Sequence, residues 1–377
     1  MRFPLPRFLF SVLAFAAMAG AAVAQDVIKV GEFASLTGKE AAFGQASHKG
    51  TQLAVEEVNA AGGVLGKKLQ LITEDNQSKA GESATIVKKL ISREKVIAIL
   101  GEVASSRSLE AAPIAQQARI PMISPSATNP RVTEMGNYVF RVCFIDPFQG
   151  AALAKFARQT MKAQKVAILT SVSSPYSVGL SKYFREPFVA AGGKIVADQK
   201  YQEGDKDFKA QLTAIKATAP DALLASGYYT EAALICKQAR DLGIKFPVFG
   251  GDGWEAPELI EIGGTAVEGT YYSTHFAPVI PTPEAQGFVK RYQARWGGEQ
   301  PDAMAALGYD SVMVLADAIK RAGTTESARL RDAIAATKNF RAVSGLTTLD
   351  AKRNATKAAV ILTVKNGKFE LVETVEP

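Results

Sequence analysis

The feature that most constrains the fold is the regular alternation of short apolar runs with amphipathic helical segments. Apolar runs such as 96–100 and 166–169 are flanked by charge or glycine, which is typical of strands covered on both faces. Between such runs lie helical patterns such as 50–59, where Leu53 and Val58 share one face. Alternating strands and helices form right-handed strand–helix–strand units, so the sequence predicts parallel sheets flanked by helices.

This alternation occurs twice, in two stretches of similar order. Residue identity between them is too low for a sequence repeat, so the correspondence rests on the pattern of elements. We therefore expect two Rossmann-like lobes of one α/β architecture. The matched elements are strands 69–73 and 195–197, helices 83–92 and 208–216, and strands 96–100 and 222–225.

Two clusters of hydroxyl side chains follow neighbouring strands of the first half. Ser105 and Ser106 follow the strand at 96–100, and the run Ser126, Ala127, Thr128 follows the strand at 121–124. Both are expected at the carboxyl ends of parallel strands, where open sheets bind ligands. Hydroxyls, free backbone N–H groups and a helix N-terminus together suit an anion, most simply a carboxylate. The alternative interpretation is ordinary capping, with Ser105 or Ser106 as the cap of the next helix.

A carboxylate and two tyrosines stand out in the second half. Asp252 lies in a glycine-rich turn directly after a strand pattern at 248–249, where the backbone can approach a ligand closely and a carboxylate suits an ammonium group. A turn aspartate is the alternative interpretation. Tyr176 and Tyr228 fall at helix or strand ends, and each offers an apolar face and one hydroxyl. The neighbouring Tyr229 is interpreted as a packing residue.

Motifs of catalysis and metal binding are nearly absent. No nucleophile elbow, phosphate loop or Cys-x-x-Cys occurs, and the two histidines, His48 and His275, have no metal-ligand neighbours at useful spacing. Cys143 and Cys236 are expected to be free thiols, because two cysteines make no disulfide framework in a chain of this size. No catalytic residue, metal or cofactor is predicted.

The first 24 residues have the form of a secretory signal peptide. Arg2 and Arg7 precede an apolar core, and the small residues Ala22 and Ala24 precede a predicted cleavage after Ala24. The net charge is +7, but no basic run concentrates it, so nucleic acid is not an expected partner. An exported, periplasmic protein is predicted.

The chain resembles the type I periplasmic binding proteins of branched-chain (Leu/Ile/Val) amino-acid ABC importers over essentially all of residues 25–377. No single motif is specific, but their combination is. The matching segments are Gly31 with 35–38, 56–66, Asp75, Gly101 with Ser105 and Ser106, 121–128, 175–176, 227–228 and 251–253.

The resemblance implies a role for each candidate site residue. Ser105 and Thr128, with the backbone at Ser126 and Ala127, would hold a ligand carboxylate, and Asp252 would hold an α-ammonium group. Tyr176 and Tyr228 would close over the ligand from the second lobe, and Phe43 would touch its side chain. The chain departs from the family pattern in three respects: Asp252 stands where Glu is frequent, Gln77 and Ala104 replace a cysteine pair, and Arg107 replaces a small polar residue.

The resulting expectation is a solute-binding protein whose chain crosses three times between two lobes. Lobe one is expected to hold 25–144 and 275–346, and lobe two 145–274 and 347–377. A small amino acid, branched-chain or otherwise hydrophobic, would bind between the lobes of a monomer and be delivered to an ABC permease in the inner membrane. The open alternatives are a binder of an aromatic or aliphatic carboxylate or amide, an exported enzyme with Asp252 or His275 as base, and a sensor module.

Overall fold

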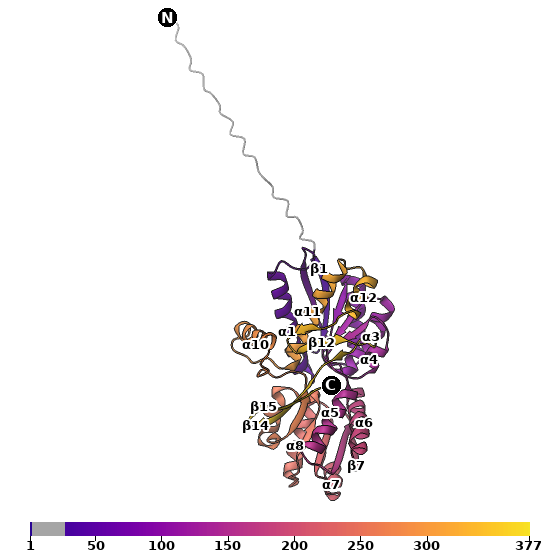
Figure 1. The fold of residues 1–377 in the computed structure, drawn as a ribbon, viewed down its shortest axis with the longest axis vertical. Helices are drawn as coiled ribbons and strands as arrows, with labels where there is room; N and C mark the ends of the chain where they lie inside the picture. The colour runs from indigo at the N-terminus through magenta and orange to yellow at the C-terminus, as the bar shows by residue number, and fades with distance from the viewer. Residues whose placement is uncertain (2–26) are drawn as a thin grey trace.

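Two β-sheets divide the chain into two lobes, which lie one above the other in Figure 1. The computed structural model describes residue 1 and residues 27–377, so the predicted signal peptide and its cleavage after Ala24 lie outside the described residues. Strands and helices alternate in both lobes, and the predicted α/β class is confirmed. No helix in the described part of the chain is both long and apolar enough to span a membrane.

Lobe one is built on a five-stranded, all-parallel sheet of order β2-β1-β3-β4-β5. Its strands are β1 (Val27–Ala34), β2 (Lys68–Asp75), β3 (Ala98–Leu100), β4 (Met122–Ser124) and β5 (Val139–Arg141). Its helices are α1 (Ala41–Ala60), α2 (Glu82–Lys89) continued by a π-helical turn (Leu90–Glu94), α3 (Ser105–Ala118), α4 (Arg131–Glu134), α10 (Pro283–Arg295), α11 (Ala303–Ala322) and α12 (Ser327–Ala335).

Lobe two is built on a seven-stranded sheet of order β15-β14-β10-β9-β8-β6-β7, antiparallel only at β14 and β15. Its strands are β6 (Lys165–Ser171), β7 (Lys194–Tyr201), β8 (Ala222–Ser226), β9 (Val248–Gly250), β10 (Tyr271–Thr274), β14 (Ala359–Lys365) and β15 (Lys368–Val375). Its helices are α5 (Asp146–Gln159), α6 (Pro175–Ala190), α7 (Lys209–Ala217), α8 (Tyr229–Asp241) and α9 (Pro257–Gly263), with 3₁₀ turns at Asp252–Trp254 and Gly264–Val267.

The chain passes between the lobes after β5, after β10 and after a small three-stranded sheet. That sheet consists of β11 (Phe340–Ala342), β12 (Gly345–Leu349) and β13 (Ala355–Thr356). Leu349 and Ala355 belong to the same apolar core as α1 and α11 of lobe one. The last crossing therefore follows Thr356, about ten residues later than the expected boundary at 346/347, because this sheet packs on lobe one.

Helix α1 begins at Ala41, earlier than the helix that the apolar pattern predicted at 50–59. The first part of α1 contains two glycines, Gly44 and Gly50, and glycine disfavours helix interiors, so the sequence pattern alone did not predict a helix there. The structure supplies their reason: a Cβ on Gly50 would lie 1.9 Å from the Ala305 carbonyl oxygen of α11. Gly50 thus allows the backbones of α1 and α11 to touch.

The expected side-chain cap of α3 is wrong. The N-cap is Ala104, whose side chain makes no cap, and Ser105 is already the first residue of the helix. The dipeptide Asn366-Gly367 predicts a hairpin between residues 359–364 and 369–372, and the structure confirms it: Lys365 pairs with Lys368 across this turn, whose two residues both have positive φ. Cys143 and Cys236 are buried free thiols, as expected.

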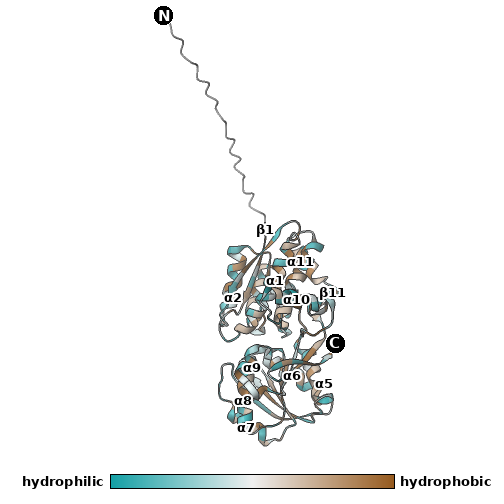
Figure 2. Ribbon diagram, turned by 90° about the vertical axis from the view of Figure 1, so that its left-hand side faces the viewer, coloured by the Kyte–Doolittle hydropathy of each residue, from teal (hydrophilic) through white to brown (hydrophobic). Residues whose placement is uncertain are grey.

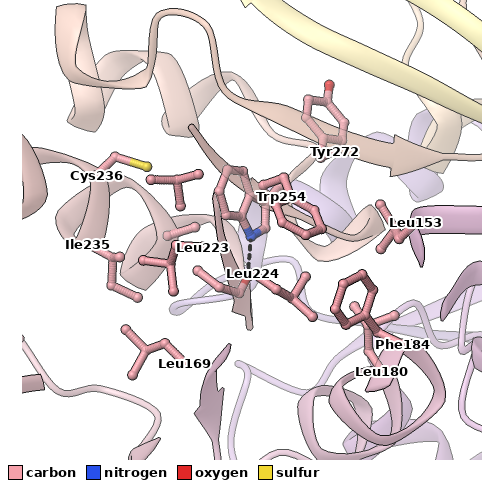
Figure 3. Packing of buried hydrophobic residues seen from close by; sticks show 14 of the residues in the cluster. Leu153, Leu169, Leu180, Phe184, Leu223, Leu224, Ile235, Cys236, Trp254 and Tyr272 are labelled. Carbon is pink, nitrogen blue, oxygen red and sulfur yellow. Dashed lines mark hydrogen bonds between the residues drawn. The ribbon is translucent and has the colours of Figure 1, made fainter. Parts of the chain in front are cut away.

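The central strands of both sheets are buried, and hydrophilic segments lie on outer helices such as α2 and α7 (Figure 2). In lobe two, Trp254 is fully buried among Leu223, Leu224 and Tyr272 (Figure 3). Its indole N–H donates to the Ala225 carbonyl at 3.0 Å. This hydrogen bond holds the short turn that contains Asp252 against the end of β8, the strand beside β9.

Candidate functional site

A small pocket lies between the lobes, where the carboxyl ends of strands from both sheets face each other. The space between its lining atoms is about 210 Å³, which includes space open to solvent. Seven of the eight residues predicted from the sequence are in its wall. The lining residues are Phe43, Val103, Ser105, Ser126, Thr128, Tyr176, Tyr228, Asp252, Gly253 and Met304.

Lobe one presents hydroxyl groups to this pocket. The Thr128 hydroxyl is buried and has no partner at hydrogen-bond geometry, although it is close enough to the Asp146 carboxyl to lower the pKa of that group. Ser105 Oγ accepts from the Asn129 backbone N–H at 3.2 Å, so its own proton stays available. Because buried hydroxyls are normally paired, an unpaired one facing a pocket indicates a polar ligand group there.

Ala127 is the predicted residue that does not line the pocket. Its N–H donates to Ser124 Oγ at 2.9 Å, and its carbonyl accepts from the Arg141 guanidinium. Arg141 is fully buried and also donates to the Asn129 carbonyl at 2.9 Å and to Thr133 Oγ1 at 3.2 Å. Ala127 and Arg141 thus hold the backbone of the loop that carries Ser126 and Thr128.

Asp252 of lobe two is buried and accepts hydrogen bonds on both carboxylate oxygens. Gln149 Nε2 lies 2.7 Å from Oδ1, and His275 Nε2 lies 3.0 Å from Oδ2. Ser126 Oγ, from lobe one, lies 3.5 Å from the same Oδ2. Burial lowers the pKa of His275, against the opposing effect of Asp252, so the imidazole is neutral at neutral pH. All of these donors are therefore uncharged.

Aromatic rings form the remaining wall. Tyr176 and Tyr228 are stacked with centroids 5.4 Å apart, and Phe43 meets the Tyr228 ring edge-on at 5.5 Å. The Gly253 N–H donates to the Tyr176 hydroxyl at 3.1 Å, whereas the buried Tyr228 hydroxyl has no partner. A Cβ on Gly251 would lie 2.4 Å from the Tyr176 hydroxyl, so glycine is required for this packing.

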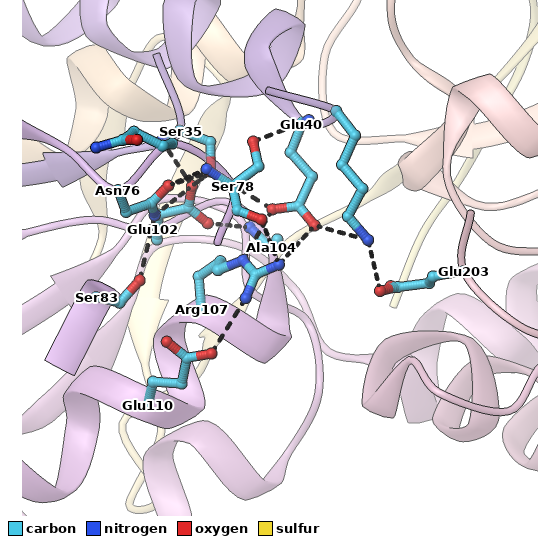
Figure 4. A network of polar contacts seen from close by, with 12 residues as sticks. Ser35, Glu40, Asn76, Ser78, Ser83, Glu102, Ala104, Arg107, Glu110 and Glu203 are labelled. Carbon is cyan, nitrogen blue, oxygen red and sulfur yellow. Dashed lines mark hydrogen bonds and ion pairs between the residues drawn. The ribbon is translucent and has the colours of Figure 1, made fainter. Parts of the chain in front are cut away.

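A buried polar network supports the loop before α3 (Figure 4). Glu102 accepts from Ser35 Oγ at 2.6 Å and from the Ala104 N–H at 2.8 Å, which ties the end of β1 to this loop. Burial, and then the charge of Glu40, raises the pKa of Glu102 to about 7. Arg107 is not in the pocket wall and pairs with Glu40 at 3.1 Å. Arg107, one of the three departures from the family pattern, therefore belongs to the network that supports the pocket and not to the pocket wall.

Asp146 is a further buried carboxyl beside the site. Its backbone N–H donates to the Thr128 carbonyl at 2.9 Å. Burial raises the pKa of Asp146 to about 8, against the opposing effect of the Thr128 side chain; the nearby charge of Asp252 acts in the same direction as burial, and Arg141 opposes it. Asp146 is thus protonated at neutral pH and adds no charge to the site.

The grouping of Ser126, His275 and Asp252 does not have the geometry of a catalytic triad. In a triad the acid contacts one imidazole nitrogen and the serine the other. Here His275 Nε2 lies 3.3 Å from Ser126 Oγ and 3.0 Å from Asp252, while Nδ1 has no partner. Within residues 27–377, no group of three or more His, Cys, Asp or Glu residues could hold a metal ion.

Sequence reasoning missed Gln149 and His275 as partners of Asp252, and Val103 and Met304 in the pocket wall. A signal existed for His275, because it directly follows β10, whose carboxyl end lies beside that of β9 and therefore near Asp252. Gln149 lies within the helical pattern of α5, where nothing distinguishes it from a surface residue.

The two lobes also contact each other around the pocket. The Tyr229 hydroxyl donates to the Lys39 carbonyl at 2.7 Å, and Lys39 Nζ lies 2.8 Å from Glu203 of lobe two. Asn129 Nδ2 donates to the Pro175 carbonyl at 2.7 Å. Tyr229, interpreted from sequence as a packing residue, thus makes a contact between the lobes, and the structure is a closed one.

Comparison with known proteins identifies the family. A sequence model described as periplasmic binding protein matches residues 27–368. The Leu/Ile/Val-binding protein homolog 2 of Brucella abortus is 32% identical over 340 residues, 90% of each chain. The leucine-binding protein LivK of Thermotoga maritima is 43% identical with a TM-score of 0.90, and the alignment covers 93% of this chain and 99% of that one.

Two further structures show different ligands on this fold. The branched-chain amino acid binding protein LivJ of Streptococcus pneumoniae, solved with isoleucine, is 38% identical with a TM-score of 0.88, covering 93% of this chain and 100% of that one. A solute-binding protein from Rhodopseudomonas palustris, solved with benzoate, is 25% identical with a TM-score of 0.84, covering 93% and 97%. By these matches, the chain belongs to the periplasmic binding protein family, and within it to the substrate-binding proteins of branched-chain amino acid ABC transporters.

Proposed function

We propose that this protein binds a branched-chain amino acid between its lobes and delivers it to an ABC permease. The observation that carries the proposal is the environment of Asp252. Both oxygens of this buried carboxylate accept from uncharged donors, so its negative charge has no cationic partner within hydrogen-bond distance among the described residues. Burying a charge is costly unless it is paired, and a ligand ammonium group supplies the missing partner.

The opposite side of the pocket suits the carboxylate of the same ligand. Ser105 and Thr128 present hydroxyls, and charge-assisted hydrogen bonds to an anion stabilise binding by roughly 1.5–3 kcal/mol each. Phe43, Val103 and Met304 supply apolar surface for a hydrophobic side chain. The relatives named for leucine, isoleucine and valine support this ligand class.

The alternative is a plain carboxylic acid or amide, of which the benzoate-binding relative is an example. Asp252 disfavours a plain acid as ligand, because the carboxylates of the ligand and of Asp252 would repel each other in the closed pocket with no cation to offset the repulsion. An amide would avoid the repulsion but leave the charge of Asp252 unpaired.

The test is isothermal titration calorimetry of the purified protein against leucine, isocaproate (the deaminated analogue of leucine) and benzoate. We expect measurable affinity for leucine and a large preference over isocaproate. Equal affinity for leucine and isocaproate would contradict the amino-acid proposal and favour a carboxylate binder.

The variant Asp252→Asn sharpens this test. It removes the partner of the ammonium group, and truncation of such a charge pair costs roughly 2–5 kcal/mol, so leucine binding is expected to weaken by at least about thirtyfold. Isocaproate binding should stay equal or improve. Asp241→Asn, an exposed change of the same net charge on α8, is the control and should leave both affinities unchanged.

The setting of this function follows from the same proposal. The chain is exported, is cleaved after Ala24 and acts in the periplasm as a monomer that is itself no enzyme. A sensor module that reports its ligand to a receptor is the second candidate. Permease and ATPase genes beside the gene of this protein would favour the importer, and native mass spectrometry would give both the mass of the subunit and that of a co-purified ligand.

A further inference from the structure

The carboxylate of Asp252 is held from two directions. An ionised carboxylate offers about four acceptor positions on its two oxygens. Gln149 occupies one position on Oδ1, and His275 occupies one on Oδ2. The Ser126 hydroxyl also reaches Oδ2, at 3.5 Å, so the position left for a ligand is on Oδ1. The pocket wall includes Asp252 but neither Gln149 nor His275.

His275 is itself held rigidly. Its side chain is fully buried, and its ring is stacked on Phe144 with centroids 3.8 Å apart and an angle of 29° between the planes. Since an ionised carboxylate only accepts, the neutral imidazole carries its proton on Nε2 and donates it to Asp252. Nδ1 is then an unprotonated, buried nitrogen without a partner. This cost is consistent with a functional constraint on the residue.

His275 also occupies a distinctive place in the chain. It lies in the crossing that follows β10, between the lobes, and its Nε2 reaches Ser126 of lobe one at 3.3 Å as well as Asp252 of lobe two. The charged groups whose fields act on His275 are Asp252 and Lys357, the latter in the last crossing between the lobes. His275 therefore joins both walls of the pocket behind the ligand.

We propose that His275 is a positioning residue that fixes the Asp252 carboxylate and thereby determines the preference of the site for an α-ammonium group. The inference rests on the proposed function. A neutral donor orients the carboxylate without neutralising it, so the full negative charge remains for the ligand. Without that donor, the short side chain of Asp252 is free to rotate toward Gln149, and the ammonium group loses an aligned partner.

The test measures the ratio of affinities for leucine and isocaproate by calorimetry in two variants. His275→Leu removes the donor and keeps an apolar side chain against Phe144, and the ratio is expected to fall at least tenfold. His275→Gln places an amide N–H near the position of Nε2, and the ratio should return to within about threefold of the wild type. His48→Gln, at the other histidine, which pairs with Glu32 in lobe one, is the control.

The outcomes separate this inference from the proposed function. A wild-type ratio near one contradicts the proposed function itself. A high wild-type ratio that His275→Leu leaves intact, or that His275→Gln does not restore, overturns the role of His275 alone. If His275→Leu fails to fold, His275→Asn replaces it, since the shorter amide does not reach Asp252, and an unchanged ratio in that variant overturns the proposal equally.

Discussion

At the scale of single residues, Thr128 and Ser105 carry the prediction about the ligand carboxylate. Their hydroxyls face the pocket, and that of Thr128 is buried without a partner. We expect Thr128→Val and Ser105→Ala each to weaken leucine binding about ten- to a hundredfold, because each loses a charge-assisted hydrogen bond worth roughly 1.5–3 kcal/mol. Calorimetry measures the affinities.

The matched control for this prediction is Ser106→Ala. Ser106 is adjacent to Ser105, has an unpaired hydroxyl and is not in the pocket wall. It should bind leucine as the wild type does, and none of the three variants should shift the thermal midpoint without ligand by more than a few degrees. Normal binding by both pocket variants would reduce the two hydroxyl clusters to ordinary structural residues.

Single residues could be predicted from the sequence where chemistry and position coincide. Asp252 stands in a glycine-rich turn after a strand, and Ser105 and Thr128 stand after neighbouring strands, so the topology alone brings them to one edge. Gln149 and Met304 could not be predicted in this way. Each lies in a helical pattern, and which helical side chain faces a pocket depends on how two lobes meet.

At the scale of elements, the packing of α1 against α11 makes the clearest prediction. A Cβ on Gly50 would meet the Ala305 carbonyl oxygen at 1.9 Å, and backbone cannot give way as a flexible side chain can. We expect Gly50→Ala to lower the free energy of unfolding by about 2 kcal/mol or more, since overpacking typically costs about 1–3 kcal/mol. Urea unfolding measures the difference.

Gly287→Ala in α10 is the control, because it makes the same change inside another helix. A Cβ there meets only the guanidinium at the end of the Arg291 side chain, at 2.9 Å, and a long side chain can shift by a few tenths of an ångström where backbone cannot. Alanine favours a helix over glycine by up to about 1 kcal/mol, so this variant should be as stable as the wild type or more stable. If both variants were destabilised equally, the packing of α1 against α11 would not be the reason that position 50 requires glycine.

The elements that sequence reasoning placed well are those with strong periodicity. The buried strand at 165–170 and the hairpin at Asn366 were predicted because apolar runs and turn chemistry act locally. The beginning of α1 was missed because its two glycines are required by packing that the local sequence does not show: Gly50 against α11, some 250 residues later in the chain, and Gly44 against the backbone of Ser35. The expected boundary at 346/347 cuts through β12, because the partners of this strand are set by tertiary packing and leave no local signal in the sequence.

At the scale of the whole molecule, the two lobes and three crossings predict closure around the ligand by hinge motion. The contacts of Tyr229 with Lys39 and of Asn129 with Pro175 exist only while the lobes are together. We expect small-angle X-ray scattering to give a smaller radius of gyration with saturating leucine than without it. An unchanged scattering curve at saturation would count against a site between the lobes.

Closure also predicts that residues outside the pocket tune affinity. Tyr229 is not in the pocket wall, yet its hydroxyl donates to the Lys39 carbonyl of the opposite lobe. If leucine binding is coupled to closure, a variant that destabilises the closed state also weakens binding. Tyr229→Phe loses this hydrogen bond, so its affinity for leucine should fall by about 0.5–1.5 kcal/mol, or two- to twelvefold. It should also enlarge the radius of gyration at subsaturating leucine.

Tyr272→Phe, which removes an unpaired hydroxyl within lobe two, is the control and should change neither quantity. Unaltered affinity in Tyr229→Phe, with closure intact, would mean that this contact follows closure without contributing to it.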